Sequence, residues 1–186
     1  MTADLTGKRI AFLLHNSGVE QPELTTPWEA FRSAGAETTL IAPEKGEVQA
    51  FTNDVEKADT FEAELAVGDA SAEEYDALVL PGGTTNADAL RQDATAVAFV
   101  KAFADAGKPV AAICHGPWAL VEADVLDGKR LTSYASLQTD IRNAGGTWVD
   151  EEAVTSTENE WTLVTSRDPD DLDAFVDAAA EAFAAG

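Results

Sequence analysis

The chain contains one cysteine, Cys114, at the junction between a predicted strand and a predicted helix. Residues 109–113 form a short apolar run typical of a buried strand, and residues 116–122 have the pattern of a helix. Small side chains lie two positions before and after the cysteine, at Ala112 and Gly116, which is the spacing of a nucleophile elbow. A helix N-terminus next to the thiol favours the thiolate. We therefore predict a reactive nucleophile; the alternative is an inert buried cysteine.

Two glycines, Gly82 and Gly83, directly follow another predicted strand at residues 76–80. Glycines at such a point let the backbone approach a ligand, and their N–H groups can form an oxyanion pocket. The alternative is a plain turn. The segment lacks the G-x-G-x-x-G spacing of a dinucleotide-binding loop, so we expect no nucleotide cofactor there.

Two carboxylic acids, Glu20 and Glu23, follow the first predicted strand at residues 8–14. A neutral carboxylic acid can donate a hydrogen bond to a thiolate, and an ionised one can act as a base. We predict that a carboxyl group of this segment faces Cys114. The alternative is exposure to solvent, because the chain carries 34 acidic side chains.

Two aromatic side chains adjoin the cysteine, His115 and Trp118. His115 could shuttle protons if an acid orients it, although a neighbour in sequence need not reach the same thiol. The alternative is a histidine that caps or packs. We expect Trp118 to line the mouth of the pocket, whereas the other tryptophans and the phenylalanines belong to the core.

Strand and helix patterns alternate along the chain, and residues 48–67 have the pattern of a small antiparallel excursion at the sheet edge. Predicted strands are residues 8–14, 37–42, 76–80, 109–113, 148–149, 153–155 and 161–165; predicted helices are 27–34, 95–106, 116–122, 136–144 and 169–183. This order predicts an α/β fold, a mostly parallel sheet with helices on both faces. Sites in such sheets lie at the carboxyl ends of the strands, where the segments after Leu14, Leu80 and Ile113 meet.

Length and charge limit the classes of function. A chain of 186 residues suits one domain, residues 1–186, and the formal net charge of −22 argues against nucleic acid and anionic membranes as partners. The acids are spread over the whole chain, which favours a surface adapted to high salt over a disordered acidic tail. No signal peptide or membrane helix is apparent, so we expect a soluble cytoplasmic protein.

The supply of metal ligands is poor. One cysteine excludes an intramolecular disulfide and a cysteine-based zinc cluster, and the chain has two histidines, His15 and His115. We therefore expect no metal and no cofactor.

Several segments together resemble the PfpI family, the intracellular-protease-I and general-stress-protein branch of the DJ/PfpI superfamily, which is related to class I glutamine amidotransferases. The resemblance extends from about residue 8 to residue 183. The matching segments are L-V-L-P-G-G at 78–83, N-A-D-A-L-R at 86–91, A-I-C-H-G-P-W at 112–118, T-S-Y-A-S-L-Q-T-D-I-R-N-A-G at 132–145 and V-T-S-R-D-P-D-D-L at 164–172.

The resemblance implies a flavodoxin-like three-layer sandwich, with Cys114 as nucleophile and His115 as its partner. It implies that Asp88, on the loop after the double glycine, completes a triad from a neighbouring subunit of a dimer or hexamer, although Ala87 stands where proline is usual. The acid that contacts the thiol corresponds to Glu23.

The remaining implied roles concern ligand contacts. Glu20 would be a nearby second acid, and the oxyanion pocket would comprise Gly83 and the backbone N–H of His115.

Family resemblance leaves the activity open. The leading hypothesis is a stress-related cysteine enzyme of the deglycase or glyoxalase type, which handles α-oxoaldehydes or their protein adducts. The alternatives are an intracellular cysteine peptidase with a triad across a subunit interface, and a non-enzymatic redox sensor or holdase. A flavodoxin-type FMN carrier is the weakest alternative, because residues 15–18 are a poor phosphate-binding loop.

Overall fold

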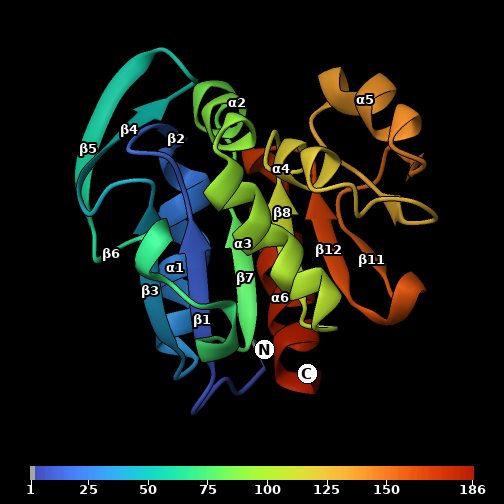
Figure 1. Cartoon of the computed structure of the whole chain (residues 1–186), viewed down its shortest axis with the longest axis horizontal. Coiled ribbons are helices and arrows are strands. Elements are labelled where there is room, and N and C mark those ends of the chain that lie inside the picture. Colours follow the sequence, from blue (N-terminus) through green and yellow to red (C-terminus); the bar gives the residue numbers. More distant parts are fainter. Residues whose placement is uncertain (1–2) are drawn as a thin grey trace.

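The computed structural model describes residues 3–186 and is built around a seven-stranded sheet (Figure 1). The strand order is β11-β12-β8-β7-β1-β3-β6, and all pairs are parallel except β11 with β12. The strands are β1 (Arg9–Leu13), β3 (Glu37–Ala42), β6 (Leu65–Ala66), β7 (Ala77–Leu80), β8 (Val110–Ile113), β11 (Val154–Ser156) and β12 (Leu163–Ser166). The predicted mostly parallel sheet is confirmed.

Helices cover both faces of this sheet (Figure 1). The helices are α1 (Gln21–Ser33), α2 (Thr84–Gln92), α3 (Ala94–Asp105), α4 (Trp118–Glu122), α5 (Gln138–Asn143) and α6 (Leu172–Ala185). In β1, Ile10 and Phe12 pack into a core with α1 and α6, while Ala11 and Leu13 pack into a second core with α3 and α4. Alternate side chains thus enter opposite cores, which gives the three-layer sandwich that the sequence predicts.

A second, three-stranded sheet lies beside the first (Figure 1). It contains β2 (Ser17–Glu20), β4 (Gly46–Thr52) and β5 (Glu56–Ala63), and β4 with β5 form an antiparallel hairpin. The hairpin turn has Asn53 and Asp54 at φ 53° and 63°, a left-handed conformation that Asn and Asp tolerate better than most residues. The predicted antiparallel excursion is confirmed, but it pairs with β2 and leaves only β6 on the edge of the main sheet.

The remaining elements are short. They are β9 (Arg130–Leu131) and β10 (Thr147–Trp148), which pair in parallel, and the 3₁₀ helices η1 (Val67–Asp69), η2 (Ala72–Glu74), η3 (Ala135–Leu137), η4 (Glu158–Glu160) and η5 (Pro169–Asp171). In the described part of the chain, no helix is both long and apolar enough to cross a bilayer.

Two expectations about helices are wrong. Helix α1 begins at Gln21 rather than at residue 27, because Pro22 suits the first turn and Pro27 is accommodated inside the helix. The segment after the double glycine is helix α2 rather than a loop, so Asp88 lies on a helix. This helix begins after Gly83, whose φ of 91° an L-residue rarely adopts.

Candidate active site

Cys114 lies at a sharp corner between β8 and α4. Its φ is 60°, its backbone N–H donates to the carbonyl of Ser166 at 3.1 Å, and its carbonyl accepts from the N–H of Tyr134 at 2.9 Å. A Cβ on Gly116 would lie 2.4 Å from the carbonyl oxygen of Leu80, so only glycine fits there. The corner therefore has the geometry of a nucleophile elbow, with the left-handed conformation imposed on a non-glycine residue.

Glu23, in the first turn of α1, is completely buried beside this thiol. Its Oε2 accepts from the backbone N–H of Gly82 at 2.8 Å, and Oε1 has no hydrogen-bond partner in the described residues. Burial is the main cause that raises the pKa of Glu23 to about 8; the charge of Glu20 acts in the same direction, and the contact with Cys114 acts against it. The carboxyl group is therefore protonated at neutral pH and can donate to a thiolate.

Cys114 as a whole residue is 6% exposed. Burial raises the pKa of Cys114, and a negative charge on Glu23 adds to this, whereas hydrogen bonds from the backbone N–H groups of Gly83 and His115 lower it. Two negative charges in one buried site disfavour each other. A thiolate at this position therefore requires Glu23 to be protonated, and it requires a base to take the thiol proton.

The two glycines of the predicted oxyanion pocket serve different purposes. The N–H of Gly83 approaches the sulfur, as does that of His115, and these two donors remain suited to an oxyanion. The N–H of Gly82 is occupied by Glu23. A Cβ on Gly82 would lie 2.3 Å from Oε2 of Glu23 and 2.7 Å from Cβ of Cys114, so this glycine lets the acid and the thiol meet.

His115 reaches the thiol directly, since its Nδ1 lies 3.1 Å from Sγ of Cys114. Burial lowers the pKa of His115, and the charge of Asp54 opposes this shift. The ring stacks on Tyr134 at a centroid distance of 4.7 Å and an angle of 26°, with Trp118 at 5.2 Å. The imidazole is thus held in a fixed orientation and neutral at neutral pH, which suits a base.

Trp118 does not line the cavity at the thiol, contrary to expectation. Its indole N–H donates to Asp140 on α5 at 2.8 Å, and the guanidinium of Arg91 lies 5.3 Å from its ring centroid. These contacts hold the ring against His115 and away from the pocket mouth.

Glu20 lines the cavity but also fixes its cover. Its two carboxylate oxygens accept from the backbone N–H groups of Asn53 at 2.9 Å and Asp54 at 3.0 Å, which ties the hairpin turn to the end of β2. Asp54 in turn accepts from Thr84. Sequence reasoning missed Asp54 in this role. An Asn-Asp pair between alternating segments signals a hairpin turn, but nothing local places that turn over Cys114.

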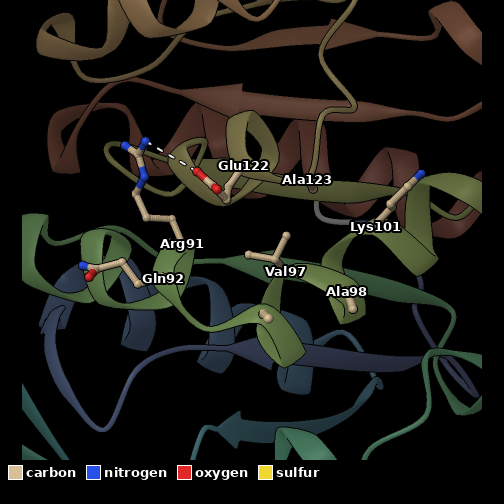
Figure 2. A pocket seen from close by; sticks show the side chains of 8 residues that line it. Arg91, Gln92, Val97, Ala98, Lys101, Glu122 and Ala123 are labelled. Carbon is tan, nitrogen blue, oxygen red and sulfur yellow. Dashed lines mark ion pairs between the residues drawn. The ribbon is translucent and has the colours of Figure 1, made fainter.

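The cavity formed by these groups has a volume of about 240 Å³. Its lining residues are Glu20, Glu23, Asn53, Asp54, Gly83, Cys114, His115, Tyr134 and Pro169. A larger hollow of about 700 Å³ lies over α2, α3 and α4 (Figure 2), but its lining contains an ion pair between Arg91 and Glu122 at 3.7 Å and neither a cysteine nor a histidine. The smaller cavity is the candidate active site.

Asp88 lies outside this cavity, exposed on α2, where its carboxylate accepts from the side chain of Gln92 at 3.0 Å. The chain does not bring it to His115, so its predicted role depends on a second subunit and stays a prediction. Among residues 3–186, no group of three or more His, Cys, Asp or Glu side chains could hold a metal ion.

Comparison with known proteins places the chain in a family. Residues 8–182 match the model of the DJ-1/PfpI family. The chain belongs to this family. Among its DJ-1/PfpI relatives, General stress protein 18 of Bacillus subtilis is 41% identical over 169 residues, which cover 91% of this chain and 94% of the relative. Protein/nucleic acid deglycase 2 of Escherichia coli is 40% identical over 172 residues, which cover 90% and 93%.

A solved DJ-1/PfpI structure confirms the fold. The ThiJ/PfpI domain protein from Brachyspira murdochii superposes with a TM-score of 0.85 over 97% of this chain and 99% of its own, at 22% identity. The predicted family and the flavodoxin-like fold are therefore both confirmed.

Proposed function

We propose that this chain is a stress-related cysteine enzyme that converts α-oxoaldehydes such as methylglyoxal to 2-hydroxy acids and acts on their adducts with proteins. One observation carries this proposal: the thiol of Cys114 lies between a buried acid, Glu23, and a buried base, His115, whose Nδ1 is 3.1 Å from the sulfur. The names of the relatives, a general stress protein and a deglycase, support it.

The first step forms a carbon–sulfur bond. His115 takes the thiol proton of Cys114, and the thiolate adds to the aldehyde carbon of methylglyoxal. The N–H groups of Gly83 and His115 stabilise the negative oxygen, which then takes the proton back from the imidazolium. The product is a hemithioacetal, with His115 neutral and Glu23 protonated.

The second step moves hydrogen between carbons. His115 removes the proton from the carbon attached to sulfur while Glu23 gives its proton to the neighbouring ketone oxygen, which forms an enediol. Glu23 then takes the proton of the hydroxyl on the sulfur-bearing carbon, and His115 returns its proton to the second carbon. The result is a lactoyl thioester of Cys114, and water hydrolyses it to lactate and the free thiol. The sequence needs no redox cofactor, because one carbon is oxidised as its neighbour is reduced.

The size of the cavity favours this reaction over peptide cleavage. A volume of about 240 Å³ holds a small aldehyde, whereas a peptidase needs an extended groove. The peptidase alternative needs Asp88 of a second subunit in a homo-oligomer. It predicts that a fluorogenic peptide is cleaved and that Asp88→Ala abolishes the cleavage.

The experiment is methylglyoxal turnover by wild type and Cys114→Ser in about 1 M KCl, where surface charges are screened. Lactate formation measures activity above the rate without enzyme. Because the chain has one cysteine, the serine variant removes every thiol. We expect a loss of at least about 10³-fold, as for removal of a covalent nucleophile. Equal lactate formation by both proteins would overturn the proposal, and an inactive wild type that protects other proteins from aggregation would leave the holdase alternative.

We also propose that the protein works in a salt-rich cytoplasm. The net charge of −22 makes the folded surface repel itself, and salt screens that repulsion within about 3 Å at 1 M. The melting temperature should therefore rise between low and molar KCl. An unchanged melting temperature would contradict a high-salt habitat.

A further inference from the structure

Nε2 of His115, the ring nitrogen remote from the thiol, lies near a hydroxyl group that is itself hydrogen-bonded to a carboxylate. Thr84 donates its hydroxyl proton to Oδ2 of Asp54 at 2.9 Å, and its backbone N–H donates to Oδ1 at 2.7 Å. The same Oγ1 of Thr84 lies 3.4 Å from Nε2 of His115. Asp54 reaches this point at the tip of the β4–β5 hairpin, which Glu20 holds in place.

These contacts determine which nitrogen of His115 carries its hydrogen. A threonine hydroxyl has one proton, and Thr84 gives it to Asp54, so Oγ1 can only accept from Nε2. Burial lowers the pKa of His115, so the ring is neutral at neutral pH and only one of its two nitrogens carries a hydrogen. A hydrogen on Nε2 leaves a lone pair on Nδ1, 3.1 Å from Sγ of Cys114. Nδ1 is then ready to accept the thiol proton.

We infer that Asp54, acting through Thr84, sets the tautomer of His115 from within the same chain. Asp54 is a positioning residue. Its carboxylate acts on the imidazole through Thr84 of the same chain, whereas the role predicted for Asp88 needs a second subunit. This role rests on the proposed function only for its turnover readout, because the tautomer and the reactivity of the thiol exist without a substrate.

Ser136 is the other neighbour of Nε2, with its Oγ at 3.2 Å. A serine hydroxyl can rotate to donate or to accept, so it adapts to either tautomer. The hydroxyl of Thr84 lacks this freedom, since it donates to Oδ2 of Asp54, a carboxylate that the backbone N–H of Thr84 also holds through Oδ1. Ser136→Ala should therefore leave the tautomer unchanged.

The direct test is nitrogen-15 NMR of the imidazole rings. The chain has two histidines, and a His15→Gln variant assigns the signals of His115. We expect wild type to show the Nε2–H tautomer and Thr84→Val to shift towards Nδ1–H, because valine keeps the shape but cannot accept. Thr84→Ser should restore the wild-type spectrum. Thr85→Val, an exposed neighbour on the same helix, is the matched control and should change nothing.

Alkylation of Cys114 by iodoacetamide at neutral pH gives a second readout without substrate. We expect Thr84→Val and Asp54→Asn to slow alkylation and methylglyoxal turnover by about 10- to 100-fold, as for a misplaced general base. Asp124→Asn controls for the loss of an aspartate at positive φ outside the site, since Asp124 has φ 55°. If the hairpin of Asp54→Asn is disturbed, the pair Thr84→Val and Thr84→Ser still decides.

Three outcomes separate the possibilities. An unchanged tautomer and alkylation rate in Thr84→Val would overturn the inference, and so would a tautomer shift in Ser136→Ala without one in Thr84→Val. A shift in Thr84→Val in a protein that does not consume methylglyoxal would support the inference and refute the proposed function.

Discussion

Two hollows in the surface differ in the burial of their titratable side chains, and we propose the chemistry for the one in which these side chains are buried. In the smaller, Cys114, His115 and Glu23 are at most 6% exposed, and the pKa of Glu23 rises to about 8. In the larger (Figure 2), the side chains of Arg91 and Glu122 are 27% and 49% exposed and their ion pair is screened by water. Side chains become reactive when they are shielded from water and held by fixed neighbours, as in the smaller cavity. The larger volume of the other hollow does not provide either condition.

After replacement of Cys114, replacement of Glu23 is expected to have the largest effect on turnover. Glu23→Gln keeps the shape but removes the transferable proton, so we expect methylglyoxal turnover to fall by about 10²-fold or more. In wild type, kcat/KM should fall as the pH rises through about 8, because the carboxyl loses its proton there. The variant should lack this alkaline decline. An unchanged decline in Glu23→Gln would assign it to another group.

The raised pKa of Glu23 should also make the free energy of unfolding depend on pH. Its pKa is 4.5 when unfolded and about 8 when folded, so the folded state binds more protons in this window and loses stability as the pH rises through it. The loss reaches at most about 5 kcal/mol by linkage. Urea unfolding from pH 4.5 to above pH 8 should show that the free energy of unfolding of wild type falls relative to that of Glu23→Gln. A constant difference would contradict a buried neutral acid.

The elbow provides a smaller, structural contrast. Gly116→Ala places a methyl group 2.4 Å from the carbonyl of Leu80 and 3.0 Å from that of Ile113, neither of which can rotate away. We expect a loss of about 1–3 kcal/mol in the free energy of unfolding and displacement of Cys114. Gly68→Ala is the control, because a Cβ there meets nothing within 4 Å. Equal urea midpoints for the two variants would mean that the backbone around Gly116 can accommodate a methyl group, which would contradict the tight corner.

The smallest effect belongs to the larger hollow. Glu122→Gln removes the partner of Arg91 at an exposed site, which should change the free energy of unfolding by no more than about 1 kcal/mol. Methylglyoxal turnover should stay at the wild-type value. A clear loss of turnover would move the site, or part of it, to this hollow.

The local parts of this site could be predicted from sequence. The elbow depends on Cys114 and small neighbours at Ala112 and Gly116, all within one turn of chain. The convergence of strand ends in a parallel sheet predicts that a carboxyl group of the segment with Glu20 and Glu23 faces the thiol, and the family resemblance selects Glu23.

The parts that sequence reasoning missed depend on distant contacts. Asp54 contacts Thr84, the neighbour of His115, because Glu20 holds the hairpin turn over the site. Helix α2 begins with Thr84, Thr85 and Asn86, which are weak helix formers. Asn86 donates to the carbonyls of residues 81 and 82. It also accepts from the backbone N–H of His15 at 2.6 Å, a tertiary contact that periodicity does not reveal.

The central claim is that Cys114 bonds covalently to the aldehyde during turnover. Rapid-quench mass spectrometry with enzyme in excess over methylglyoxal tests it directly. We predict an adduct with the mass of one methylglyoxal on the peptide that contains Cys114, which decays at the rate at which lactate appears. Lactate that accumulates without such an adduct, or an adduct that outlasts lactate formation, would contradict the account.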